Sequence, residues 1–216
     1  MRFGAILLLG GKSERFGTAI PKQFQELKGK KLYEHALKAL TSFHLFEEII
    51  LVAPEGVNLP NSVTGGETRQ LSSYKGLMAL SKHTDYVLIH DGARPFLTHA
   101  ILERHVEAVQ KYQAVNTCIP SPDAINLVKD GKSFSIAKRG EALRGQTPQS
   151  FSYSLILEAH KKSKMKDAPC DCSLILEAGH PVHIVEGSEK NFKITSRQDL
   201  AFAEFLYPSL KLTVQS

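Results

Sequence analysis

Short apolar runs alternate with stretches of helical periodicity along this chain of 216 residues. The apolar runs predict strands at 3–9, 48–53, 86–90, 114–119 and 182–186, with a shorter strand at 192–194. The periodic stretches predict helices at 32–43, 67–80, 98–112, 154–164, 171–178 and 196–205. Such alternation is typical of a mostly parallel sheet with helices on both faces. We therefore expect one α/β domain over residues 1–216, with a three-layer, Rossmann-like fold.

Residues 124–137 break this alternation. Two strand-like runs, 124–128 and 134–137, flank the dipeptide Asp130-Gly131. Asp-Gly between two such runs is a strong signal for a tight hairpin turn. An isolated two-stranded hairpin is only marginally stable in water, so we expect residues 123–138, here called the arm, to pack on another surface.

Composition narrows the classes of partner. The formal net charge of +5 suits anionic ligands, but no run of five or six basic residues indicates nucleic-acid binding. No segment has the 18 or more apolar residues of a membrane span, and the run at 3–9 is too short for a signal peptide. Three cysteines, an odd number, argue against a disulfide framework. These features together predict a cytoplasmic protein that binds neither nucleic acid nor membrane.

One group of residues imitates a zinc site. Cys170 and Cys172 precede His180 and His183. The C-x-C spacing lacks the two to four intervening residues of a zinc knuckle, and the sequence that follows predicts a helix. The pattern therefore does not indicate a metal site there.

The loop after the first strand is typical of phosphate binding. Gly10-Gly11 can turn sharply and present backbone N–H groups to an anion, while Arg15 and Lys22 add two cations nearby. It is not a P-loop, because Ile6 stands where that motif needs its first glycine. It is not the dinucleotide fingerprint either, because Ser13 replaces the second glycine. A glycine cradle with two cations instead suits a triphosphate whose charge redistributes during reaction.

Five motifs in order resemble the 2-C-methyl-D-erythritol 4-phosphate cytidylyltransferases of the non-mevalonate isoprenoid pathway. The similarity extends over roughly residues 3–206. The motifs are Gly10-Gly11-Lys12 to Phe16 with Pro21-Lys22-Gln23-Phe24, Gly65-Gly66-Glu67-Thr68-Arg69, His90-Asp91-Gly92-Ala93-Arg94-Pro95, Gln146-Thr147-Pro148-Gln149, and Asn191-Phe192-Lys193-Ile194-Thr195.

The resemblance implies a reaction and residues for it. A phosphate oxygen of the sugar-alcohol phosphate attacks the α-phosphorus of CTP and expels pyrophosphate. Arg15 and Lys22 match residues that stabilise the transition state, while Arg139 and Lys193 match residues that hold the acceptor phosphate in line. Gly66 and Ser72 match positions that contact cytosine. Further ligand-binding positions are implied at Leu9, Gly10, Gly11, Glu67, Gly92 and Thr147.

The resemblance also implies a metal ion and a dimer. Asp91, at the end of an apolar strand, is the candidate to approach Mg²⁺ or the substrate hydroxyls, and an ion pair with Arg94 is its alternative role. In the family the protruding arm embraces a second subunit, which implies a homodimer.

Several positions depart from the family pattern. Ala124 and Cys170 stand where threonine is common, and Cys172 replaces an acid. These three changes fall on the acceptor side and leave nucleotide activation untouched. Residues 146–151 also resemble ribitol 5-phosphate cytidylyltransferases, so that activity is the alternative. A non-catalytic nucleotide-binding module is the second alternative, but it would not need all four cations.

Overall fold

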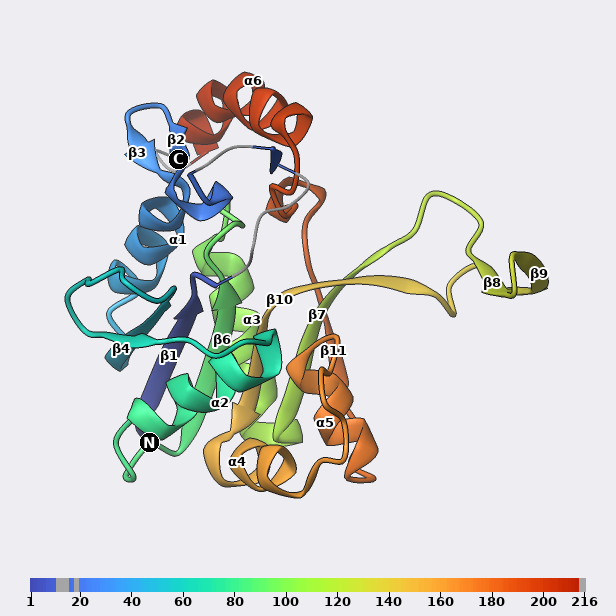
Figure 1. The fold of residues 1–216 in the computed structure, drawn as a ribbon, viewed down its shortest axis with the longest axis horizontal. Helices are drawn as coiled ribbons and strands as arrows, with labels where there is room; N and C mark the ends of the chain where they lie inside the picture. The colour runs from blue at the N-terminus through green and yellow to red at the C-terminus, as the bar shows by residue number, and fades with distance from the viewer. Residues whose placement is uncertain (11–15, 18–19, 214–216) are drawn as a thin grey trace.

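A seven-stranded sheet forms the middle layer of the protein (Figure 1). The computed structural model describes residues 1–10, 16–17 and 20–213. Within them the strand order is β11-β7-β10-β6-β1-β4-β5. Strand β10 runs antiparallel to both neighbours, β6 and β7, and the other described pairings within this seven-stranded sheet are parallel. The strands are β1 (Phe3–Leu8), β4 (Phe46–Ala53), β5 (Ser62–Thr64), β6 (Tyr86–Asp91), β7 (Ala114–Pro120), β10 (Leu143–Ser152) and β11 (His183–Glu186).

Helices cover both faces of this sheet, as the alternation predicts. Helices α2, α4 and α5 pack with Ile6 and Leu8 of β1, whereas α1 and α3 pack with Ala5 and Leu7 on the opposite face. Side chains of β1 are thus buried on both sides, which explains its unbroken apolar run. The helices are α1 (Leu32–Thr41), α2 (Arg69–Ala79), α3 (His99–Tyr112), α4 (Tyr153–Lys162), α5 (Asp171–Glu177) and α6 (Arg197–Thr213).

Local signals fixed the start of α6 but not its end. The Asp199 carboxylate accepts from the backbone N–H of Ser196 at 2.8 Å. In return, the Ser196 hydroxyl accepts from the backbone N–H of Asp199 at 3.2 Å. This is the capping box expected from the sequence. Ala203 is fully buried in the cluster beneath α6, and the helix continues to Thr213, beyond the predicted end at 205.

The strand predicted at 192–194 is wrong. This segment follows the 3-10 helix η3 (Glu189–Asn191) and pairs with no described strand of the sheet. A single backbone bond joins Ile194 N to Ala93 O at 2.9 Å. Ile194 is fully buried beside Ala203, so the apolar run reflects packing against α6 rather than a place in the sheet.

Strand β10 was missed, and its composition explains why. Its buried positions include Gln146, Thr147, Gln149 and Ser150, which give no apolar signal. These side chains are paired across the sheet, as in the 2.9 Å bond from the Gln149 amide to Asn116 Oδ1. Burying polar groups is tolerated when each finds a partner, and the partners lie far away in sequence.

The arm forms as predicted and stands away from the body (Figure 1). Strands β8 (Asn126–Lys129) and β9 (Lys132–Ile136) pair antiparallel around Asp130 and Gly131, whose φ angles are +50° and +74°. Two positive φ angles are what a type I′ hairpin turn requires. Every residue of both strands is exposed.

Candidate active site

A cleft of ≈ 940 Å³ opens at the carboxyl ends of β1, β4 and β6. It is lined by residues from six separate stretches: 8–10, 21–23, 53–55, 64–75, 91–93 and Lys193. Ligands of open α/β sheets bind at this edge because the strand-to-helix loops converge there. The structure thus brings together seven predicted site residues: Gly10, Lys22, Gly66, Glu67, Ser72, Asp91 and Lys193.

The loop before α2 is held in shape by Ser72. Its hydroxyl accepts from Gly66 N at 3.0 Å and donates to Thr68 O at 2.9 Å. Thr68 caps the helix, because its side chain accepts from Leu71 N at 3.1 Å. A Cβ at Gly66 would lie 2.3 Å from Leu71 Cγ, so the close packing of this loop requires glycine. Contacts of Gly66 and Ser72 with cytosine stay predictions; here Ser72 shapes the loop.

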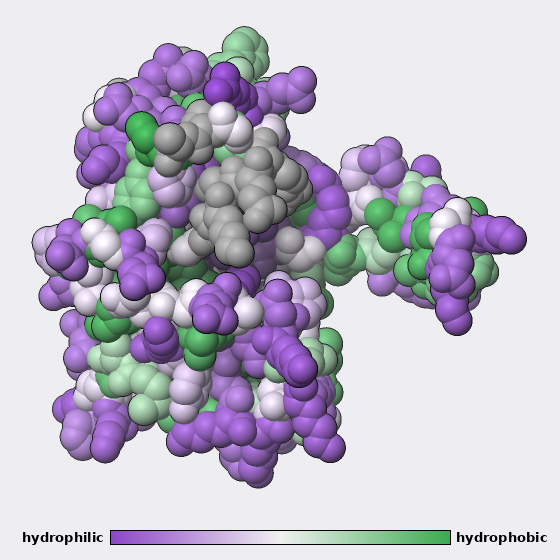
Figure 2. Space-filling view, in the orientation of Figure 1, coloured by the Kyte–Doolittle hydropathy of each residue, from purple (hydrophilic) through white to green (hydrophobic). Residues whose placement is uncertain are grey.

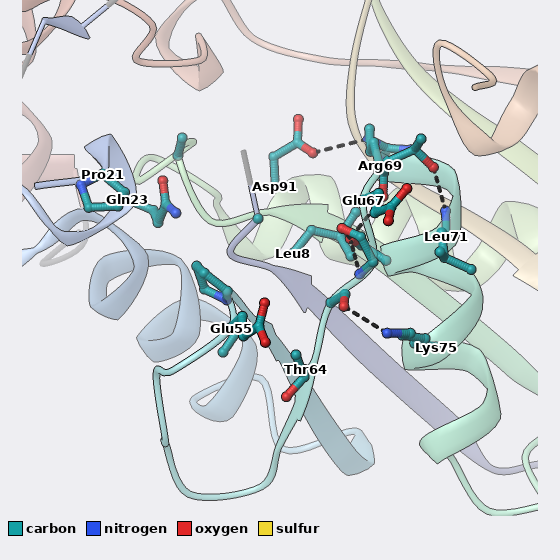
Figure 3. A pocket seen from close by; sticks show the side chains of 18 of the residues that line it. Leu8, Pro21, Gln23, Glu55, Thr64, Glu67, Arg69, Leu71, Lys75 and Asp91 are labelled. Atoms are coloured by element: carbon teal, nitrogen blue, oxygen red, sulfur yellow. Dashed lines mark hydrogen bonds and ion pairs between the residues drawn. The ribbon is translucent and has the colours of Figure 1, made fainter. Parts of the chain in front are cut away.

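The Pro-Lys-Gln motif contributes all three of its residues to the cleft wall, and its glutamine also anchors the segment to the sheet. Pro21 precedes the 3-10 helix η2 (Lys22–Phe24), and Pro21, Lys22 and Gln23 line the cleft. Figure 3 shows Pro21 and Gln23 on its wall. The buried amide of Gln23 donates to the carbonyl oxygen of Leu9 at the end of β1. This bond fastens the segment to the sheet and thereby positions Lys22, a role for Gln23 that the motif itself could have revealed.

Asp91 is surrounded by cations. Lys193 Nζ lies 2.9 Å from Asp91 Oδ2, and Arg94 Nε lies 3.5 Å from the same oxygen. Arg69 Nε lies 3.6 Å from Oδ1 (Figure 3). Burial would raise the pKa of Asp91, but Lys193, Arg69 and Arg94 hold it well below its usual range. The carboxylate is therefore ionised, and the alternative pairing with Arg94 is present together with two further ion pairs.

Three predicted ligand-binding residues lie behind the cleft rather than on its wall. Leu9 is fully buried, and Gly92 N donates to Leu8 O at 2.9 Å. A Cβ at Gly92 would lie 2.5 Å from Leu9 Cδ2, so glycine permits the close approach of the β1 and β6 ends. Thr147 Oγ1 accepts from Asp91 N at 3.0 Å. Within the described part of the chain these residues brace Asp91, and their direct contact with ligands stays a prediction.

The remaining predicted positions are not gathered into this cleft. Arg139 is exposed on the stretch between the arm and β10 and does not line the cleft of its own chain. Gly11 and Arg15 lie outside the described residues. Three further residues line the cleft but are not among the predicted site residues: Arg69, Lys75 and Glu55. Arg69 belongs to a motif quoted above and could have been found there, whereas the other two have no local signal.

Metal ligands within the described residues are few. No group of three His, Cys, Asp or Glu side chains placed to hold an ion occurs among them. Asp91, Glu55 and Glu67 supply the carboxylates of the cleft wall. Such a set suits an ion carried mainly by substrate oxygens, as Mg²⁺ usually is on a triphosphate. Nor is any helix in the described part both long enough and apolar enough to cross a membrane.

Comparisons with known proteins agree with the motifs. The family model for 2-C-methyl-D-erythritol 4-phosphate cytidylyltransferase matches residues 4–209. The enzyme of that name from Clostridium beijerinckii is 37% identical over 224 residues, covering 95% of this chain and 98% of the relative. The relative from Thermosipho melanesiensis is 35% identical over 214 residues, covering 91% of this chain and 93% of its own.

Solved structures lead to the same family. The 4-diphosphocytidyl-2C-methyl-D-erythritol synthase of Anaerococcus prevotii superposes with a TM-score of 0.83 at 28% identity, covering 96% of this chain and 98% of that one. The 2-C-methyl-D-erythritol 4-phosphate cytidylyltransferase of Thermus thermophilus gives 0.82 at 32% identity, covering 96% and 100%. This chain therefore belongs to the 2-C-methyl-D-erythritol 4-phosphate cytidylyltransferase family.

Proposed function

We propose that this chain transfers the cytidylyl group of CTP to 2-C-methyl-D-erythritol 4-phosphate and releases pyrophosphate. The observation that carries the proposal is one cleft lined by the Gly66 loop, Lys22 and Lys193, with Asp91 paired to Lys193 at 2.9 Å. The acceptor's phosphate oxygen forms a bond to the α-phosphorus, and the bond from that phosphorus to the oxygen that bridges the α- and β-phosphates breaks. That oxygen leaves with its electron pair as a terminal oxygen of pyrophosphate. No general base is needed, because the attacking phosphate is already an anion at neutral pH.

The main obstacle to this reaction is the approach of two polyanions, which positioning and charge neutralisation can overcome. Lys22 is assigned to the nucleotide side, because η2 is tied to the end of β1 beside Gly10. Lys193 is assigned to the acceptor phosphate. In the structure its ammonium group contacts Asp91 at 2.9 Å, so binding of the acceptor would exchange or share this contact. Arg15 is assigned to the transition state by the resemblance.

Mg²⁺ is proposed as the accompanying cation. When bound it would neutralise triphosphate charge, and Asp91 is the carboxylate at the inner end of the cleft that could approach it. Because Lys193 already pairs with one oxygen of Asp91, we expect the ion to be held chiefly by the nucleotide. The three cysteines are free, which supports a reducing compartment such as the cytoplasm.

We further propose a homodimer formed through the arm. Four large apolar side chains of the arm are 45–67% exposed: Leu127, Val128, Phe134 and Ile136. Figure 2 shows apolar patches on this protruding segment. Burying these groups against a second copy would stabilise an arm that has little support in one chain. It would also bring Arg139, which is exposed and does not line the cleft of its own chain, toward a neighbouring copy.

Measuring pyrophosphate release tests the main proposal. With CTP, Mg²⁺ and 2-C-methyl-D-erythritol 4-phosphate we expect turnover, and with ribitol 5-phosphate at equal concentration much less. The names of the relatives support this order of acceptors. Turnover only with ribitol 5-phosphate would reject the assigned acceptor, and binding of CTP without turnover of either would leave a nucleotide-binding module.

A further inference from the structure

A second carboxylate lies behind the cleft, at the start of α5. Asp171 is 1% exposed and does not line the cleft. Its Oδ1 accepts from the Ser73 hydroxyl at 2.6 Å and lies 3.1 Å from His160 Nε2, while Oδ2 accepts from Arg69 Nη1 at 2.7 Å. A buried charge is costly unless it is paired and hydrogen-bonded, and Asp171 satisfies both conditions. Nothing in the reaction described above uses this residue.

Arg69 stands between the two buried carboxylates. Its Nη1 is 2.7 Å from Asp171, and its Nε is 3.6 Å from Asp91 Oδ1 in the cleft (Figure 3). The third nitrogen, Nη2, is buried and has no hydrogen-bond partner among the described residues. A guanidinium group has five donors and favours bidentate pairing with a carboxylate. Arg69 thus has unused donors and two possible anionic partners.

The distances show which partner holds Arg69. The contact with Asp171 is a short charge-assisted hydrogen bond, whereas the contact with Asp91 is longer than a hydrogen bond. Burial would raise the pKa of Asp171, but Arg69 and His160 keep it well below its usual range, so the carboxylate stays charged. The other carboxylate oxygen of Asp91, Oδ2, therefore pairs with Lys193 Nζ at 2.9 Å.

We propose that Asp171 is a positioning residue of this active site: by holding Arg69, it prevents that arginine from pairing closely with Asp91. The inference rests on the proposed function, in which Asp91 and Lys193 face the substrates. Without the charge of Asp171, the guanidinium would turn its free donors to the nearest remaining carboxylate. Asp91 would then be fixed toward Arg69 and drawn away from Lys193 and the ligands.

Two variants separate this role from simple stabilisation. Asp171→Asn keeps the shape of the side chain and one acceptor oxygen, but it removes the charge and replaces the other acceptor with an NH2 donor. We expect kcat to fall by roughly 10-fold or more, as misplacement of a catalytic group costs. Combining it with Arg69→Met removes the competing guanidinium. The kcat of the double variant should therefore be at least about 3-fold higher than that of Asp171→Asn, because groups in contact are energetically coupled. A merely structural role predicts further loss instead.

The matched control is Tyr153→Phe, which removes the 3.0 Å hydrogen bond from the tyrosine hydroxyl to Leu77 O of α2. It should lower thermal stability while kcat stays within about twofold of wild type, since it touches neither carboxylate. A double variant no more active than Asp171→Asn would overturn the proposal.

A crystal structure of the Asp171→Asn variant gives a readout that needs no turnover. We expect the distance from the Arg69 guanidinium to Asp91 Oδ1 to shorten from 3.6 Å into hydrogen-bond range. An unchanged distance would overturn the inference. If wild-type protein transfers no cytidylyl group, the proposed function fails, and this distance still decides the role of Asp171.

Discussion

His105 makes the stability of the fold sensitive to acid. It is fully buried on α3, with Nδ1 2.6 Å from Ser150 Oγ of β10 and Nε2 2.6 Å from Thr117 Oγ1 of β7. The Thr117 hydroxyl donates to Pro148 O at 2.6 Å, so it accepts from His105 Nε2–H. Both ring nitrogens are therefore satisfied in the neutral form. Burial, with His90 and Arg104 adding to it, lowers the pKa of His105 from 6.5 to about 3.

The sign and size of the effect follow from proton linkage. Between pH 6.5 and about 3 the unfolded chain binds a proton at this position that the folded chain does not, so stability is lost as the pH falls. The slope is about 1.4 kcal/mol per pH unit for one group. At pH 5, about 1.5 units below 6.5, His105 alone should lower the free energy of unfolding by roughly 2 kcal/mol relative to neutral pH. The lowered pKa values of Asp91 and Asp171 affect stability mainly below about pH 3.8, under the pH range of the assay. Burial also lowers the pKa of His90, to about 4, and that of His35, so these residues add to the loss in both wild type and a His105 variant.

The assay is urea unfolding, monitored by circular dichroism at pH 7.5, 6.0, 5.5 and 5.0. His105→Gln cannot take up a proton, so its free energy of unfolding should fall by roughly 2 kcal/mol less than that of wild type between pH 7.5 and pH 5. Its absolute stability at neutral pH does not enter the comparison. The control Tyr153→Phe should lose stability at every pH but keep the wild-type slope. Parallel pH curves for wild type and His105→Gln would refute the reasoning.

Four further predictions concern the site and the arm. Lys22→Ala should lower kcat by roughly 10²-fold, the loss expected when one donor that stabilises negative charge in the transition state is removed. Lys193→Ala should raise KM for the acceptor and lower kcat together, with CTP affinity in calorimetry near wild type; loss of CTP binding would reverse the assignment of sides. Gly66→Ala should weaken CTP binding, because its Cβ would meet Leu71 Cγ at 2.3 Å, and unchanged calorimetric affinity would contradict this. Deleting residues 123–138 should give monomers in sedimentation equilibrium, and a persisting dimer would reject the proposed role of the arm.

The sequence by itself determined the features whose causes are local. The apolar run of β1 was readable because this strand is buried on both faces and therefore needs apolar side chains throughout. Shorter apolar runs likewise indicated β4, β6, β7 and β11. Asp130-Gly131 determined the hairpin turn, and Ser196 with Asp199 determined where α6 begins. The five motifs, in their order along the chain, also identified the family. Within the site, it selected Lys22, Gly66, Asp91 and Lys193, which do line one cleft.

Only the tertiary structure decided the features whose partners are distant in sequence. Strand β10 lies antiparallel between β6 and β7 because its polar side chains bond to groups such as Asn116 and His105, and no local pattern records such pairs. The surroundings of Asp91 depend on Arg69 and Lys193, 22 and 102 positions away in the chain, and their distances of 3.6 and 2.9 Å set which cation holds which oxygen. The charge balance of the cleft follows from packing, because Coulomb attraction depends on separation in space and not on spacing along the chain.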